Sequence, residues 1–308
     1  MTGFRRLSIA SLFATLVLVA IGGLVRATQS GLGCGDDWPH CNGRLAPALE
    51  TRAEVIEFSH RFVAMIVGFM VLGMAILAWR HYRNNRRILR PALGALALVI
   101  FQALLGALVV MQELKAETVV VHLVGSMSVL ALLLYIIGNV GADQGRLRIE
   151  ADAATSRQAV VVALSVLALL MVGSYVSSYP DRPPAWPLID GQLIPDLSNS
   201  VFLVHFVHRV LALVVAVILV VFCLRVIKRK GSHSARFAHA ALGLFVIETL
   251  VGAANVWTDL NSLIVTLHLL LGALIWSSLI AIAVVTRPAL EEVAARQALR
   301  TGPVLESH

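Results

Sequence analysis

The sequence predicts an all-α integral membrane protein, with eight transmembrane helices arranged as two pseudo-symmetric four-helix bundles. Composition gives the first indication. The 308 residues are 58% hydrophobic and only 14% charged, with a mean hydropathy of +0.83, whereas about a quarter of the residues of a soluble protein are charged. The apolar residues also fall into blocks of about 20, the length that crosses a bilayer as a helix. Finally, motifs of the first half of the chain recur in the second.

The first apolar block follows a short basic segment, as the h-region of a signal peptide would. Its apolar core runs from Leu7 to Val25, longer than the usual h-region of about 7–15 residues, so we expect a retained helix. Seven further blocks follow, separated by polar segments. The predicted helices span residues 7–27, 57–79, 91–111, 118–138, 159–178, 201–224, 235–254 and 263–286.

Basic residues are distributed unevenly between the two sides of the predicted helices. With both ends of the chain in the cytoplasm, 18 of the 25 Lys and Arg residues fall in cytoplasmic segments and five in outer segments. The positive-inside rule therefore predicts a multi-pass protein of the cell membrane with cytoplasmic N- and C-termini. Topology accounts for the net charge of +7, so the lipid bilayer is an expected partner and nucleic acid is not.

The two halves of the sequence share three anchors at nearly one offset. The stretch EFSHRFVAMIVG aligns with HFVHRVLALVVA 148 residues later, QALLG aligns with ETLVG 146 residues later, and the histidine of VVVHLVG aligns with that of VTLHLLLG, again 146 residues later. An offset of four helices preserves the direction of crossing, which predicts a parallel internal repeat. We expect a first bundle at 1–140, a cytoplasmic linker at 141–158, a second bundle at 159–287 and a cytoplasmic tail at 288–308.

Four of the ten histidines lie near the outer ends of predicted helices. His60, His122, His208 and His268 each fall three to seven residues into a helix that starts at the outer surface, roughly 5–10 Å deep. A polar side chain at this depth is costly unless protein surrounds and partners it. One such histidine alone is more often bonded to a backbone carbonyl, but four in a repeated pattern favour metal ligation.

Two histidines in each bundle favour haem iron over zinc. Zinc takes four protein ligands, or three with water, and neither pair has an accompanying set of cysteines or carboxylates. Two imidazoles on facing helices suit axial ligation of haem iron. Gly125 and Gly272 could let the flat ring approach the backbone. Arg61 and Arg209, each directly after a histidine, suit pairing with haem propionates, and the alternative is that both arginines reach up to the outer surface.

One residue breaks the symmetry between the halves. Glu57 precedes His60 by one helical turn on the same face, whereas His205 takes that place in the second half. A partly shielded carboxyl group beside one haem is a candidate proton donor or acceptor. The alternative is a carboxylate that is favoured by the dipole of the helix N-terminus, and position alone does not separate the two roles.

The first outer loop contains a cysteine pair, Cys34 and Cys41. An outer location permits a disulfide, and the alternatives are a thiol pair that exchanges electrons or a surface metal site. The third cysteine, Cys223, lies near the inner end of the sixth predicted helix. With no other thiol nearby, we expect a disulfide that braces the loop over the first bundle.

Together these motifs resemble the haem A synthase family. The resemblance is carried by GGLVRATQSGLGC, the DWP and CNG that follow it, EFSHR, and single histidines on the fourth, sixth and eighth predicted helices. It implies oxidation of the C8 methyl group of haem O to a formyl group, which gives haem A for cytochrome oxidase. It also implies that Glu57, His60 and His122 handle the substrate haem, and that His208 and His268 hold a resident haem b.

The sequence departs from the family pattern in two places. Many members have a shorter Cys-Pro-Asp-Trp-Pro-x-Cys loop, whereas Gly-Asp-Asp separates Cys34 from Trp38 here. Some members carry a second cysteine pair in the outer loop between the fifth and sixth helices, and residues 175–200 contain none. We expect this proline-rich loop to cover the haem b site instead, with Trp186 as a packing anchor.

The resemblance further implies a haem O synthase that supplies the substrate, and an electron donor. Two other functions compete: a dihaem b-type cytochrome that passes electrons from quinol, and a haem carrier that leaves its cargo unaltered. The asymmetry of Glu57 against His205, and the cysteine loop over one half only, favour distinct roles for the two sites.

Overall fold

The computed structural model describes residues 2–36, 38–45, 47–178, 188–189, 191–229 and 231–288, which contain eight α-helices and no strand. All eight helices are long and apolar enough to cross a membrane, so the predicted all-α multi-pass membrane protein is confirmed. Trp186 and the tail from residue 289 onward lie outside the described residues. The helices are α1 (Thr2–Ala27), α2 (Arg52–His81), α3 (Arg86–Met111), α4 (Ala116–Asp143), α5 (Ala153–Val176), α6 (Ser200–Ile227), α7 (His233–Trp257) and α8 (Ser262–Val285).

Most helices begin before the predicted apolar blocks because polar residues cap them. Thr51 is the N-cap of α2, where its hydroxyl accepts a backbone N–H of the first turn, so α2 begins at Arg52. Asp152 caps α5 in the same way, and α5 therefore begins at Ala153, inside the predicted linker. Hydrophobicity marks only the part of a helix that lies in hydrocarbon, whereas the capped turns extend past it.

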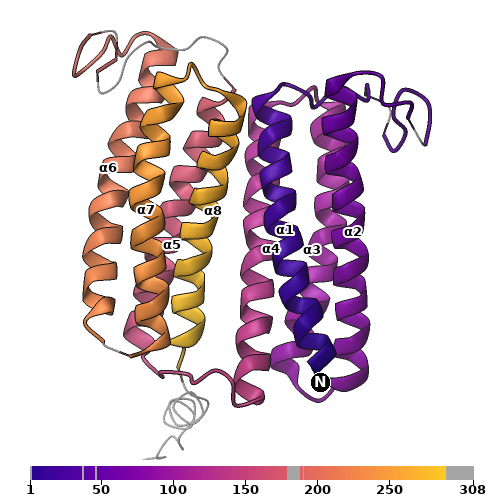
Figure 1. The fold of residues 1–308 in the computed structure, drawn as a ribbon, viewed down its shortest axis with the longest axis vertical. Helices are drawn as coiled ribbons and strands as arrows, with labels where there is room; N and C mark the ends of the chain where they lie inside the picture. Colours follow the sequence, from indigo (N-terminus) through magenta and orange to yellow (C-terminus); the bar gives the residue numbers. More distant parts are fainter. Residues whose placement is uncertain are drawn as a thin grey trace, which may run out of the picture.

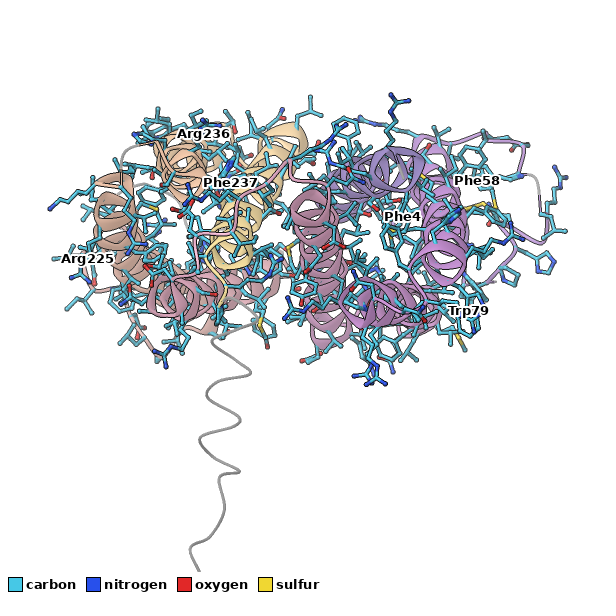
Figure 2. All side chains as sticks on the ribbon, turned by 90° about the horizontal axis from the view of Figure 1, so that it is seen from below. Phe4, Phe58, Trp79, Arg225, Arg236 and Phe237 are labelled. Atoms are coloured by element: carbon cyan, nitrogen blue, oxygen red, sulfur yellow. A yellow bond between two sulfur atoms is a disulfide. The ribbon has the colours of Figure 1, made fainter. Side chains whose placement is uncertain are left out.

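The helices form two groups of four that stand side by side (Figure 1). In the first group, contacts join α1 to α2, α2 to α3, α3 to α4 and α4 back to α1; the second group, α5 to α8, closes in the same way. Seen along the helices, each group is a ring (Figure 2). Phe4 points into the first ring and packs on Tyr82, with ring centroids 5.0 Å apart, whereas Trp79 lies at the rim. This arrangement gives two four-helix bundles, and the pseudo-symmetry between them stays a prediction.

Helix α8 joins the two bundles. It contacts α1 and α4 of the first bundle as well as α5 and α7 of its own. In the apolar part of α8, 72% of the residues are buried, against at most 33% in any other helix. The hydrophobic cluster around it combines Val19 and Met127 of the first bundle with Ile275 and Leu279 of α8. The core of the second bundle is therefore continuous with one wall of the first.

At the end of the molecule that carries the N-terminus, polar contacts hold the two halves together. The backbone N–H of Glu150 donates to the carbonyl of Val285 at 2.8 Å, and the carboxylate of Glu150 accepts the N–H of Ser234 at 2.9 Å. Arg287, which follows α8, donates from Nη2 to Oδ1 of Asn139 in α4 at 2.9 Å. The segment between the bundles is thus bonded to the second bundle, and the residues that follow α8 are bonded to the first.

Gly138 of α4 provides a test of the packing between the bundles. A Cβ at this position would lie 2.3 Å from Cγ1 of Val284 in α8. We expect Gly138→Ala to destabilise the protein by about 1–3 kcal/mol, because the β-branched valine cannot rotate away freely. As the matched control, Gly94→Ala in α3 adds a Cβ with nothing within 4 Å, and its better helix propensity should raise stability by about 0.5 kcal/mol. Thermal unfolding in detergent measures both, and equal melting temperatures would contradict the tight contact.

Candidate histidine sites

The four predicted ligand histidines lie at one end of the molecule, which we call the histidine end: the end where α2, α4, α6 and α8 begin. His60 and His208 are each the ninth residue of their helices, and His122 and His268 are each the seventh. At 1.5 Å per residue they lie about 9–12 Å from the helix start, deeper than predicted because each helix begins before its predicted apolar block. All four side chains are partly exposed.

Each of these imidazoles packs against a glycine of the preceding helix. A Cβ built on that glycine would lie 3.1–3.2 Å from the histidine Cε1 in three of the four pairs, closer than carbon atoms normally approach, and 3.4 Å away in the pair of Gly106 with His122. Without a Cβ, the ring can rest against the backbone of the neighbouring helix. The pairs are Gly22 with His60, Gly106 with His122, Gly173 with His208, and Gly252 with His268.

Sequence analysis missed these glycines, although a signal was present. Gly106 and Gly252 end the repeated stretches QALLG and ETLVG, so both occupy the same place in the repeat. The glycines chosen instead have other neighbours. A Cβ at Gly125 would lie 2.1 Å from Oε1 of Gln102, and a Cβ at Gly272 would lie 2.8 Å from Cδ2 of Leu170. These two glycines therefore make room for side chains of α3 and α5, which occupy the space that was expected for a flat ring.

Within each bundle the two histidines are close enough to interact electrostatically. The interaction joins His60 with His122 and His208 with His268, the two pairs that the sequence analysis proposed. All four Nδ1 atoms are buried, and none makes a well-aligned hydrogen bond. Because the rings are partly exposed while Nδ1 is covered, Nε2 is the nitrogen through which each ring could act as a ligand.

Glu57 is buried and is bound by three donors. Its Oε2 accepts the backbone N–H of Cys34 at 2.8 Å, and its Oε1 accepts Nε of Arg61 at 3.0 Å and Nη2 of Arg61 at 2.5 Å. The side chain is 4% exposed. In this arrangement the carboxylate anchors both the first outer loop and Arg61, a role that its position in the sequence did not indicate.

The predicted disulfide between Cys34 and Cys41 is present. It closes a loop that is bonded to α2 through a second buried carboxylate, Glu54, which sequence analysis overlooked. Glu54 accepts Nδ2 of Asn42 at 3.0 Å and the backbone N–H of Glu50 at 2.9 Å. The spacing of Thr51 and Glu54 is that of a capping box, which could have marked Glu54 as a structural residue.

The two predicted propionate-binding arginines hold equivalent loop positions. Nη1 of Arg61 donates to the carbonyl of His40 at 2.9 Å, and Nη1 of Arg209 donates to the carbonyl of Leu188 at 3.2 Å. Each acceptor lies 21 residues before its arginine. Each guanidinium thus ties an outer loop to the helix that carries a histidine.

The polar residues of α3 and α7 differ in what they contact. Nε2 of Gln102 donates to the carbonyl of His122 at 2.7 Å and to the hydroxyl of Ser126 at 2.9 Å. Glu248, at the equivalent place in the second bundle, instead faces the ring of His268, with Oε1 2.9 Å from Nδ1. In the sequence analysis these residues served only as anchors of the repeat.

No group of three His, Cys, Asp or Glu side chains that could hold a metal ion occurs among the described residues.

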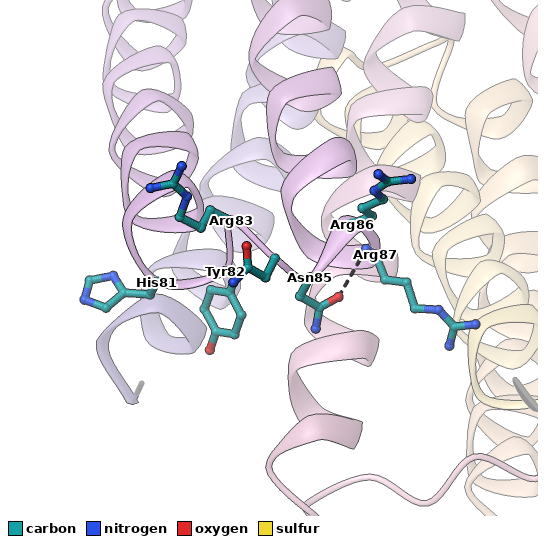
Figure 3. Close-up of a pocket in the computed structure, with 7 residues that line it drawn as sticks. His81, Tyr82, Arg83, Asn85, Arg86 and Arg87 are labelled. Atoms are coloured by element: carbon teal, nitrogen blue, oxygen red, sulfur yellow. Dashed lines mark hydrogen bonds between the residues drawn. The ribbon is translucent and has the colours of Figure 1, made fainter.

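An open, basic depression of about 650 Å³, lined by residues from His81 to Arg87, lies at the opposite end of α2 (Figure 3). It is about 30 Å from His60 at the helical rise, so it belongs to neither histidine pair.

Comparison with known proteins agrees with the family that the first-loop motif predicts. Residues 5–280 match the family model described as cytochrome oxidase assembly protein. A relative from Alkalihalophilus pseudofirmus, named haem A synthase, is 30% identical over 297 residues, which cover 92% of this chain and 99% of the relative. Haem A synthases from Shouchella clausii and Staphylococcus carnosus are 29% and 28% identical, over 80% and 87% of this chain and 83% and 89% of their own lengths. The chain therefore belongs to the cytochrome oxidase assembly protein family.

Proposed function

We propose that this chain is a haem A synthase, an oxidoreductase that converts the C8 methyl group of haem O to a formyl group and so supplies haem A for cytochrome oxidase. Family membership and the names of the relatives support this proposal. The observation that carries it is the presence of two histidine pairs, each ring resting against a glycine of the preceding helix. An enzyme that binds two haems, one as substrate and one as cofactor, needs two such sites.

The residues present fit haem at both sites. His60 and His122 would hold haem O, the substrate, and His208 and His268 would hold a resident haem b. Imidazole nitrogens are common ligands of haem iron, and the covered Nδ1 atoms would leave Nε2 for that role. Bound at the second site, haem b would supply one-electron transfer.

The asymmetry between the bundles supports this division of roles. Glu57 and the disulfide loop lie beside His60, whereas His205 occupies the place of Glu57 in the second bundle. Chemistry on a methyl group requires the movement of protons, and electron transfer by a resident haem does not. This place in the repeat therefore holds a carboxylate bonded to the outer loop at one site and an imidazole at the other, which favours distinct roles for the two sites over a cytochrome with two equal sites.

The arginines at the histidine end would help to hold both haems. Arg61 follows His60 and Arg209 follows His208, so each guanidinium lies near the site while it binds a loop carbonyl. A guanidinium has five N–H donors, so a propionate can be bound in addition to the existing partners. Haem binding would thereby also fix the outer loops.

Topology and partners follow from the same proposal. The positive-inside rule assigns both termini to the cytoplasm and the histidine end to the outer side of the cell membrane. Conversion of a methyl to a formyl group introduces an oxygen atom from dioxygen or water and requires a redox partner. A haem O synthase would deliver the substrate. The change from methyl to formyl removes four electrons from the carbon, so with dioxygen as oxidant the redox partner would be an electron donor that completes the reduction of dioxygen to water, and with water as the oxygen source it would accept the electrons.

Pigment analysis tests the proposal directly. The protein should be produced in cells that make haem O, purified, and its haems identified by chromatography and mass. We expect haem b together with haem O or haem A. Haem b alone, found in active preparations, would identify a dihaem cytochrome. Haem O that stays unaltered on incubation with oxidant and reductant would identify a carrier.

Replacement of Glu57 by Gln separates chemistry from anchoring. Gln keeps an acceptor for the N–H of Cys34 but cannot take up a proton, so a catalytic role predicts roughly a 100-fold loss of haem A formation with haem content unchanged. Loss of haem and rapid proteolysis of the first outer loop would instead show that Glu57 only anchors the loop. Full activity would exclude the catalytic role.

Gly173→Val tests the contact between α5 and α6. The new side chain would push the ring of His208, whose Cε1 lies 3.1 Å from the Cβ position, and we expect roughly a tenfold fall in haem b affinity. Gly243→Val is the matched control, because a Cβ there meets nothing within 4 Å. Haem b content per protein, measured by absorbance, gives the answer. Equal content in the two variants would contradict the role of the glycine.

A further inference from the structure

A half-buried carboxylate lies against the ring of His268, and among the described residues none of the other three histidines pairs with a carboxylate. Glu248 lies in the middle of α7 with its side chain 16% exposed, and Oε1 is 2.9 Å from Nδ1 of His268. Its Oε2 is buried and has no hydrogen-bond partner. The N–H direction of His268 is not aimed at the oxygen in this conformation, so a small rotation of the ring would complete a hydrogen bond at this distance.

Such a carboxylate needs a reason to be in an apolar helix. Removing an ionisable group from water is costly, and such groups are retained inside a membrane protein when they are paired or functional. The partner of Glu248 is the imidazole itself. Removing this carboxylate would therefore change chiefly the surroundings of His268.

The first bundle shows that this contact is not imposed by the fold. Gln102 occupies the same place in α3, 146 residues earlier, but its amide donates to the carbonyl of His122 and to the hydroxyl of Ser126. A carboxylate cannot donate to a carbonyl, and the residue equivalent to Ser126 is Gly272, which has no hydroxyl. These two differences leave the ring nitrogen as the partner of Glu248.

We infer that Glu248 is a positioning residue for His268: it accepts the Nδ1 proton, fixes Nε2 as the ligating nitrogen, and makes the haem at the second site harder to reduce. The inference rests on the proposed haem b site of His208 and His268. Histidine ligands usually donate their second N–H to a carboxylate or carbonyl, which orients the ring and raises its basicity. A more basic imidazole stabilises ferric over ferrous iron, whereas the first bundle lacks a carboxylate at the equivalent place.

The test is a redox titration of the full-length protein purified with its resident haem b. Glu248→Gln keeps an acceptor of similar shape and removes the negative charge. We expect the ferric–ferrous equilibrium to shift roughly tenfold toward ferrous iron, which equals about 59 mV for a one-electron couple. Low-spin absorption bands should stay in place. Glu113→Gln, which removes an exposed carboxylate at the same end of the molecule, should leave the potential unchanged.

The outcomes separate this inference from the proposed function. An unchanged potential in Glu248→Gln with haem b still bound overturns the role of Glu248 alone. If the His268→Ala variant retains haem b, the assignment of the site is overturned, and this inference is overturned with it. If Glu248→Gln fails to retain haem, Glu248→Asp decides, because it keeps the charge. Haem retained with a potential near that of the wild type supports the inference, and loss of haem from this variant too overturns it.

Discussion

The absence of a side chain at four glycines is the constraint on which the rest of the structure depends. An imidazole inside a membrane protein must be kept from lipid and still reach the interior of its bundle. Here each ring lies against bare backbone of the preceding helix, at Gly22, Gly106, Gly173 and Gly252. A larger residue at any of them would separate the two helices or turn the ring. Helix spacing and histidine orientation are therefore set by the same contact.

Around this shared scaffold the two bundles differ in a few polar residues. Glu57 faces the disulfide loop where the second half has His205, and Gln102 bonds to a backbone carbonyl where Glu248 faces an imidazole. None of these differences alters the ring of helix contacts. The surroundings of each histidine pair can therefore be changed by single residues, because the backbone that positions the pair is fixed by glycine and by hydrophobic packing.

The fold could be predicted from the sequence because hydrocarbon thickness imposes a length on every apolar block. The helix ends could not, since caps such as Thr51 and Asp152 lie in polar segments that carry no hydrophobic signal. Candidate ligands were identifiable because the repeat places histidines at equivalent positions. The surroundings of these ligands could not be predicted, because a contact such as that of Arg61 with the carbonyl of His40 depends on the path of the loop. Likewise, the contact at Gly125 depends on how far the side chain of Gln102 extends from α3 toward α4.

The central position of α8 has a consequence for assembly. It is the last of the eight helices to leave the ribosome, yet it packs on α1 and α4 as well as on α5 and α7. The earlier helices must remain in the bilayer with one apolar wall of the first bundle covered by lipid until α8 inserts. Truncation before α8 would thus leave the second bundle open and one apolar wall of the closed first bundle uncovered, so quality-control proteases of the membrane would encounter defects in both halves.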